Sequence, residues 1–303
     1  MNGLVQNTTR DAWLAERRKG IGGSDVAAIL GLSRWRTAVD VWLDKRGLAD
    51  DRPETDAMRF GTLLEPIVLD EFTRRTGYEV RRGLPIQTSD EHPFMLASLD
   101  GLIEDELAIV EAKTARTADG WGEDGSSDIP VYYHTQVAHY MAVTGAKIAY
   151  VPVLIGGQDF RIFAVERDDG FIADLIEAER EFWHSHVLTE TPPVPTTAAD
   201  ALLLWARDNG TSVEADDELA ETVAKLKAVK AEIKELEERA ALLDDRLRVA
   251  FAEHATLTHR GQVLATFKAQ TARRLDVKSL ESAHPDIASA FRRESTSRVL
   301  RLK

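Results

Sequence analysis

Residues 107–115 read LAIVEAKTA, a short apolar run that ends in an acid and a base two positions apart. The apolar residues predict a buried strand over 106–113. Side chains alternate along a strand, so Glu111 and Lys113 are expected to point to the same face. Burying two charges costs free energy unless hydrogen bonds, an ion pair or a ligand compensate for it. The stretch therefore predicts a charged site at the end of a buried strand.

Two preceding stretches, YEVRRGLPIQ (78–87) and FMLASLDGLI (94–103), also read as strands. With residues 106–113 they predict an antiparallel meander. Its last hairpin places Asp100 beside Glu111.

The resulting set of an acid, a second acid and a lysine is suited to metal-dependent phosphodiester hydrolysis. Proteins hold Mg²⁺ with one or two carboxylates plus water and phosphate oxygens, which fits Asp100 and Glu111. The backbone carbonyl of Ala112 is a candidate further ligand. Lys113 can orient the attacking water or help to deprotonate it, and can offset charge on the phosphate. The alternative is a surface hairpin with an ion pair, because this short pattern also occurs by chance.

The rest of the first two thirds of the chain alternates between helical and extended patterns. Gly47 and Gly77 are expected to end helices, and Ser24 is expected to be the N-cap of another. The pattern predicts helices over 10–19, 24–30, 37–47, 57–77, 131–145 and 170–188, and strands over 147–157 and 159–167. A Gly/Ser/Asp-rich loop fills 116–130 and is long enough to suggest function.

The chain changes character after TPPVP (191–195). From Leu219 to Ala250, mostly apolar residues recur at intervals of three and four, which predicts a long helix with a heptad seam that needs a partner. The residues after it predict a strand–helix–strand cap. We expect a nuclease domain over 1–195, a linker and long helix over 196–258, and a small basic cap over 259–303.

Composition excludes several classes of site. The 303 residues include no cysteine, which rules out disulfides, thiolate metal sites and cysteine nucleophiles. No apolar run approaches the ~20 residues of a membrane span, and the N-terminus lacks a signal pattern, so we expect a soluble cytoplasmic protein. The net charge of −13 does not exclude DNA, because residues 259–303 carry ten Lys/Arg against four Asp/Glu.

Three further motifs each allow a structural and a functional interpretation. Glu65 lies among apolar residues in FGTLLEP, and Gln136 and Tyr140 share a helical face in QVAHY. In RRKGIGGSD (17–25), basic residues precede a glycine turn and a helix start, which favours an anion. Taken singly, these motifs are read as ordinary structural or solvated features.

Together, the ordered motifs RRKGIGGSDVAAILGLSRW, FGTLLEP, ASLDG, VEAK and QVAHY resemble the YqaJ-like viral recombinases. That family is part of the lambda-exonuclease-like PD-(D/E)xK nuclease superfamily, and the resemblance covers residues 10–190. It implies an α/β fold with a restriction-endonuclease-like core, in which a central mixed sheet is flanked by helices. To this core the C-terminal pattern adds the long coiled-coil-like helix and a small α+β cap.

The resemblance also implies roles for individual residues. It implies Glu65, Asp100 and Glu111 as ligands of one or two Mg²⁺ or Mn²⁺ ions, Lys113 as the catalytic lysine, Gln136 as the active-site glutamine and Tyr140 as its companion. A DNA 5′-phosphate pocket would use Arg18, Ser24, Arg34 and Ser98, although the turn between Arg18 and Ser24 is one residue shorter than in the family. Leu99 replaces a proline often found before the motif aspartate, and this leaves the ligands intact.

The function implied is a phage or prophage-type exonuclease acting in a bacterial host cell. It would degrade linear double-stranded DNA from the 5′ end and leave a 3′ single strand for a strand-annealing partner protein. A ring-shaped homo-oligomer around DNA and no association with a membrane are expected. The alternatives are an endonuclease on the same fold, or an inactive module that binds DNA ends.

Overall fold

The computed structural model describes residues 15–49, 55–294 and 296–303. The chain divides into two compact units, one ending at Leu204 and the other beginning at Trp205. The expected helix over 10–19 lies largely outside the described residues. Among the helices that are described, none is both long and apolar enough to cross a membrane.

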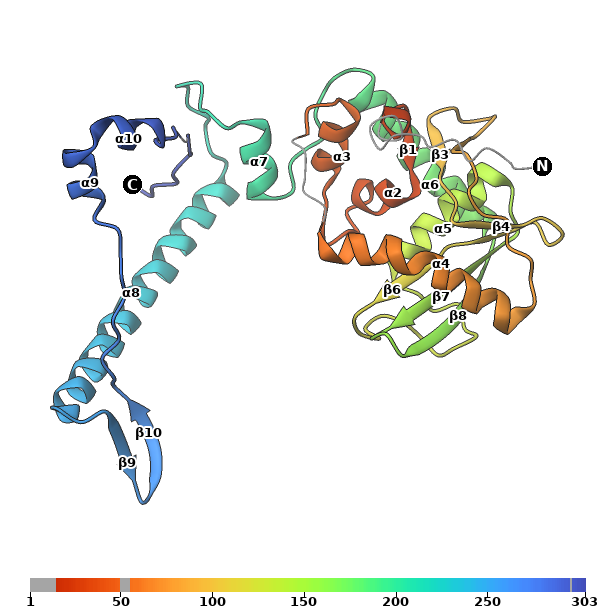
Figure 1. Cartoon of the computed structure of the whole chain (residues 1–303). Helices are drawn as coiled ribbons and strands as arrows, with labels where there is room; N and C mark the ends of the chain where they lie inside the picture. Colours follow the sequence, from red (N-terminus) through yellow and green to blue (C-terminus); the bar gives the residue numbers. More distant parts are fainter. Residues whose placement is uncertain (1–14, 50–54, 295) are drawn as a thin grey trace. The chain divides into compact units, whose positions relative to one another are not determined.

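A five-stranded mixed sheet forms the centre of the first unit (Figure 1). Strand β7 is its axis: β8 pairs with it antiparallel along one edge, and β5 and then β6 pair with it parallel along the other. Strand β4 pairs antiparallel with β5. The bounds are β4 Gly101–Ile103, β5 Ala108–Val110, β6 Lys113–Ala115, β7 Ile148–Ile155 and β8 Asp159–Glu166.

Helices cover both faces of this sheet. Helix α4 (Asp56–Thr76) packs Leu69 and Phe72 against Ala108 and Val110. On the other face, α5 (Val131–Thr144) and α6 (Asp169–Phe182, followed by the π-helix η1, Trp183–Val187) pack over Ile109. Successive residues of β5 thus enter two cores, which explains why residues 108–110 are all apolar, whereas Leu107 lies in the turn before β5 and is exposed. The predicted fold class, a central mixed sheet flanked by helices, is confirmed.

The predicted antiparallel meander is confirmed only in part: β4 pairs antiparallel with β5 and Arg81 bridges antiparallel to Leu102, but the middle strand is divided. Residues 94–103 divide into β3 (Met95–Ala97) and β4, which belong to different sheets. Strand β3 pairs parallel with β1 (Ile21–Gly22) and antiparallel with β2 (Gln87–Thr88). Strand β4 begins at Gly101, where a Cβ would lie 2.3 Å from the Val80 side chain, a close approach only glycine permits.

A buried charged pair ties three of these elements together. The Nδ1 atom of His139 on α5 lies 2.8 Å from the carboxylate of Glu179 on α6, and its Nε2 atom lies 2.9 Å from the carbonyl oxygen of Leu96 on β3. Burial lowers the pKa of His139, but these two acceptors more than offset it and the pKa is raised. His139 is therefore a structural residue.

The expected helices at the start of the unit are present, with one corrected boundary. Helix α3 (Ala38–Lys45) begins after Thr37, whose hydroxyl accepts from the Asp40 N–H. Helix α2 (Gly23–Ile29) begins after Gly22 and not after Ser24. Asp25 is the reason, because its carboxylate accepts the Gly22 N–H at 3.0 Å and fixes the earlier start.

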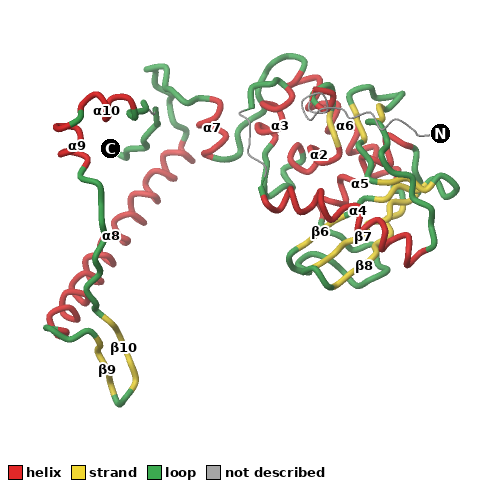
Figure 2. Tube along the Cα trace, viewed as in Figure 1, coloured by secondary structure: helices red, strands yellow, loops and turns green. Residues whose placement is uncertain are grey.

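Pro66 lies inside α4 without ending it, and Gly77 ends α4 in the left-handed conformation as predicted. Helix α7 (Ala198–Leu204) closes the unit. Figure 2 distinguishes these helices from the strands by colour.

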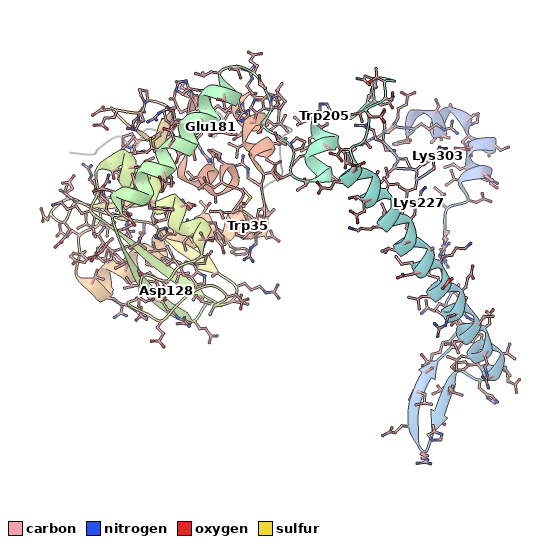
Figure 3. All side chains as sticks on the ribbon, turned by 180° about the vertical axis from the view of Figure 1, so that it is seen from behind. Trp35, Asp128, Glu181, Trp205, Lys227 and Lys303 are labelled. Carbon is pink, nitrogen blue, oxygen red and sulfur yellow. The ribbon has the colours of Figure 1, made fainter. Side chains whose placement is uncertain are left out.

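The second unit contains the predicted long helix, α8 (Asp217–Phe251), on which Figure 3 labels Lys227. A hairpin of β9 (Thr256–His259) and β10 (Gln262–Thr266) follows, then α9 (Val277–Ala283) and α10 (Pro285–Ala290). Among the described residues after α10 no strand forms, so the expected strand–helix–strand cap is wrong in its last element. The apolar positions of the heptad seam are mostly exposed on the single chain, for example Leu219, Ile233 and Leu236.

Candidate active site

Residues 108–115 form an interrupted strand. Strand β5 pairs with residues 148–150 of β7 and β6 with residues 153–155, so Glu111 and Ala112 occupy the break between them. The Ala112 N–H, which the ladder does not use, donates to the Asp100 carboxylate at 2.9 Å. The break in the strand therefore places Asp100 beside Glu111, as the predicted hairpin required.

The carboxylate of Glu111 is the centre of the site. Its Oε1 atom accepts from the Lys113 ammonium at 2.6 Å and from the Gln136 side-chain amide at 2.6 Å. Gln136 also donates to the Tyr140 hydroxyl at 3.3 Å. Glu111 is only 3% exposed, and its Oε2 atom is buried with no hydrogen-bond partner among the described residues. A buried carboxylate oxygen without a partner is costly and marks a position for a cation.

Crowded acids perturb the titration of the site. Burial, reinforced by the charge of Asp100, raises the pKa of Glu111 to about 8. Burial also raises the pKa of Asp100, against the opposing effects of Lys113 and the Ala112 N–H. The pKa of Lys113 is lowered by burial but raised more strongly by Glu111 and Asp100, so its net shift is upward. Lys113 is therefore a cation. Beside it, the negative charge of Asp100 or Glu111 makes ionisation of the other less favourable.

Glu65 approaches this pair from helix α4, on the opposite face of the sheet from Gln136. It is half-buried, and burial followed by the charge of Asp100 raises its pKa to about 7. Among the described residues no three acidic or histidine side chains are close enough to form a preassembled metal site. The residues still fit a hard cation held by two carboxylates plus water and phosphate oxygens, with the free Oε2 of Glu111 as one ligand.

A hollow of about 200 Å³ opens beside the acids. Its lining includes Asp100, Glu111, Gln136 and Tyr140. Arg17, Ser24 and Ser98 also line it, and the Arg17 guanidinium donates to the Ser24 hydroxyl at 2.9 Å. One cavity thus holds both carboxylates and charged and hydroxyl donors.

The structure places Arg17, and not Arg18, beside Ser24. The Arg18 guanidinium lies 3.8 Å from the Asp44 carboxylate of α3. Arg34 is also outside the lining of the hollow: its guanidinium carbon lies 5.7 Å from the centre of the Trp35 ring. Of the four residues expected to bind a phosphate, Ser24 and Ser98 line the hollow. The sequence did contain a signal for Arg17. The turn between Arg18 and Ser24 is one residue shorter than in the family, whereas the turn between Arg17 and Ser24 has the family's length.

Asp25 is a buried residue of this region that the sequence reasoning did not identify. Its carboxylate lies 2.7 Å from the Lys45 ammonium, 2.9 Å from the Arg36 guanidinium and 3.9 Å from that of Arg17. Burial would raise the pKa of Asp25, but the three cations hold it well below the usual range. One carboxylate thereby anchors Arg17 and the start of α2, which carries Ser24.

Gly23 sets the distance between α2 and α5. A Cβ at this position would lie 2.6 Å from the Tyr140 ring and 3.0 Å from the Gln136 side chain. Only glycine allows the helix that carries Ser24 to approach the helix that carries Gln136 this closely. The glycine turn noted in the sequence is thus a packing requirement of the site.

Comparison with known proteins agrees with the motifs. The model of the YqaJ-like viral recombinase domain matches residues 12–147. The protein named "Uncharacterized protein YqaJ" of Bacillus subtilis (strain 168) is 36% identical over 99% of this chain and 97% of its own length.

Solved structures of exonucleases are more distant. The alkaline exonuclease LHK-Exo of Laribacter hongkongensis, in complex with dAMP, is 21% identical over 60% of this chain and 94% of its own, with a TM-score of 0.49. A putative exonuclease of Eubacterium rectale is 11% identical over 73% of this chain and 99% of its own, with a TM-score of 0.46. The full-length match to the Bacillus protein, together with the domain match, shows that this chain belongs to the YqaJ-like viral recombinase family.

Proposed function

We propose that the protein is a Mg²⁺-dependent nuclease that hydrolyses phosphodiester bonds of DNA. The observation that carries the proposal is the buried Glu111 carboxylate, one oxygen of which is hydrogen-bonded to Lys113 and Gln136, while the other has no hydrogen-bond partner in the described part of the chain. Family membership and the exonuclease names of the structural relatives agree with this activity.

Asp100, Glu111 and the Ala112 carbonyl, with Glu65 nearby, would hold one or two Mg²⁺ or Mn²⁺ ions. Such ions polarise a phosphate and lower the pKa of bound water. The chain's own groups do the remaining work. Lys113, a cation held at 2.6 Å from Glu111, offsets charge on the scissile phosphate. Gln136 fixes the orientation of the Glu111 carboxylate, and Tyr140 in turn fixes Gln136.

The substrate we propose is the 5′-phosphorylated end of linear double-stranded DNA. Arg17, Ser24 and Ser98 offer one charge and two hydroxyls in the same hollow as the acids. A terminal phosphate carries up to two negative charges, whereas an internal diester carries one, so this arrangement favours ends. Digestion from that end leaves a 3′ single strand, the substrate of a strand-annealing partner in recombination. A ring-shaped homo-oligomer and an origin in a bacterial phage or prophage complete the proposal.

The test is digestion of a linear duplex whose two strands carry different labels at their 5′ ends, with Mg²⁺ and with EDTA. Release of 5′-terminal nucleotides in Mg²⁺ alone supports the proposal. A covalently closed circle is the matched control, because its cleavage would indicate an endonuclease. End binding without cleavage in Mg²⁺ or Mn²⁺ would instead indicate an inactive end-binding module.

A further inference from the structure

A row of aromatic side chains leads from the catalytic lysine to the protein surface. The Lys113 ammonium lies 4.8 Å from the centre of the Tyr133 ring. The Tyr133 ring centre lies 4.5 Å from that of Tyr132, which lies 4.8 Å from that of Trp35. Trp35 ends the row in the loop between α2 and α3 (Figure 3), and it is 61% exposed. An indole this exposed gains little from burial in the fold.

The loop holds Trp35 in a defined position. The Ser33 hydroxyl accepts from the backbone N–H groups of Trp35 and Arg36, both at 3.2 Å. The Arg34 guanidinium carbon lies 5.7 Å from the Trp35 ring centre and 5.6 Å from that of Tyr132. The indole is thus fixed against Tyr132 with a cation beside both rings. We call Arg34, Trp35 and Tyr132 the Trp35 platform.

Helix α5 relates the Trp35 platform to the active site. Tyr132, Gln136 and Tyr140 are four residues apart and lie on one face, separated by about 6 Å along the axis. Gln136 bonds Glu111, and Tyr140 lines the hollow with Arg17 and Ser24. Along α5 the platform therefore lies one turn before Gln136, and Tyr140, beside which Gly23 and the start of α2 lie, is one turn after it. The Trp35 platform and the proposed phosphate pocket thus flank Gln136, which holds Glu111.

We propose that the Trp35 platform stacks an unpaired nucleobase of the attacked DNA strand, immediately 3′ of the scissile phosphate. The inference rests on the proposed function, which places the 5′-terminal phosphate in the hollow. Proteins that bind single strands combine aromatic faces with arginine, because every base has a π-face and the backbone is anionic. An apolar protein partner would instead bury the Arg34 charge without a counter-ion. Stacking here would hold the strand open where the next nucleotide must enter.

The test uses 2-aminopurine, whose fluorescence is quenched by stacking, as the second nucleotide of a 5′-phosphorylated duplex. Binding is measured in EDTA, which stops hydrolysis and leaves the platform unchanged. We expect quenching with the unmodified protein, and its loss with Trp35→Ala together with about tenfold weaker binding, equivalent to ~1.4 kcal/mol. Trp35→Phe should retain most of the quenching. Trp205→Ala removes another exposed indole, 50% exposed, and should change nothing.

Three results would overturn the proposal. The first is unchanged quenching and affinity in Trp35→Ala. The second is quenching only when the probe is in the complementary strand. The third is a changed oligomeric mass of Trp35→Ala by light scattering with quenching retained, which would assign the indole to a subunit interface. Cleavage of the same duplex by the unmodified protein in Mg²⁺ tests the proposed nuclease function separately.

Discussion

Arg17→Gln is expected to remove most of the preference for a 5′-phosphorylated over a 5′-hydroxyl duplex end. Arg17 is the cation that the structure places against Ser24, at 2.9 Å, with a side chain 25% exposed. A hydrogen bond to a charged group contributes about 1.5–3 kcal/mol. Partial exposure favours the lower end of that range, so the preference should fall by about tenfold.

The substitution should leave the fold intact. Asp25 keeps its closer partners, Lys45 at 2.7 Å and Arg36 at 2.9 Å, when the Arg17 guanidinium at 3.9 Å is removed. Glutamine also retains much of the length of the arginine side chain. The melting temperature of the variant should therefore remain close to that of the unmodified protein.

The assay compares initial rates of nucleotide release from otherwise identical linear duplexes with a 5′ phosphate or a 5′ hydroxyl. Arg18→Gln is the matched control, because the Arg18 guanidinium faces Asp44 at 3.8 Å outside the hollow. That variant should keep the preference. If Arg18→Gln abolishes the preference and Arg17→Gln preserves it, the assignment of the phosphate pocket to Arg17 is refuted.

Four other predictions concern the site, the fold and the second unit. Lys113→Ala should lower the rate of Mg²⁺-dependent cleavage by about 10²–10³-fold with an unchanged circular dichroism spectrum; undiminished turnover would remove the lysine from the mechanism. Asp25→Asn should lower the free energy of unfolding by about 3 kcal/mol at neutral pH, because it leaves the buried Lys45 ammonium unpaired. The lowered pKa of Asp25 means that this contribution is present above the ordinary carboxyl pKa of ~3.9 and is lost as pH falls, so urea titrations of the two proteins should converge in acid. Gly23→Ala should cost about 1–3 kcal/mol of stability and reduce cleavage, because the new methyl would meet Tyr140 at 2.6 Å; retention of both would contradict the close packing of α2 on α5. Removal of residues 205–303 should change the number of subunits measured by light scattering, because the apolar seam of α8 is exposed on a single chain; an unchanged subunit number would exclude the seam as a subunit contact.

Local patterns in the sequence determined much of the fold. The apolar run 107–110 predicted a buried strand, and residues 108–110 form one because α4 and α5 cover opposite faces of β5, whereas Leu107 lies in the exposed turn before it. Glycines at 47 and 77 predicted the ends of α3 and α4, since a left-handed residue there depends on the glycine itself. The pairing of Asp100 with Glu111 followed from one short hairpin, and the structure contains that hairpin.

Longer-range pairing was decided only by the tertiary structure. Strand character in 94–103 was correctly predicted, but alternation does not specify a partner, and β3 joins β1 across more than seventy residues of sequence. The prediction of the cap's last strand failed for the same reason, because a strand-like pattern does not specify which strand it would pair with. The alternation of apolar residues indicates which face of a strand is buried, but it does not indicate which strand lies beside it.

The same division holds for the candidate site. The sequence identified Asp100, Glu111, Lys113 and Gln136, whose chemistry is local to their motifs. It placed Arg18 beside Ser24, where the structure has Arg17, because the side chain that reaches Ser24 depends on Asp25, Lys45 and Asp44, which the fold assembles from α2 and α3. Residue types fix which charges are available, but only the packing of helices around a buried carboxylate decides which cation is directed into the hollow.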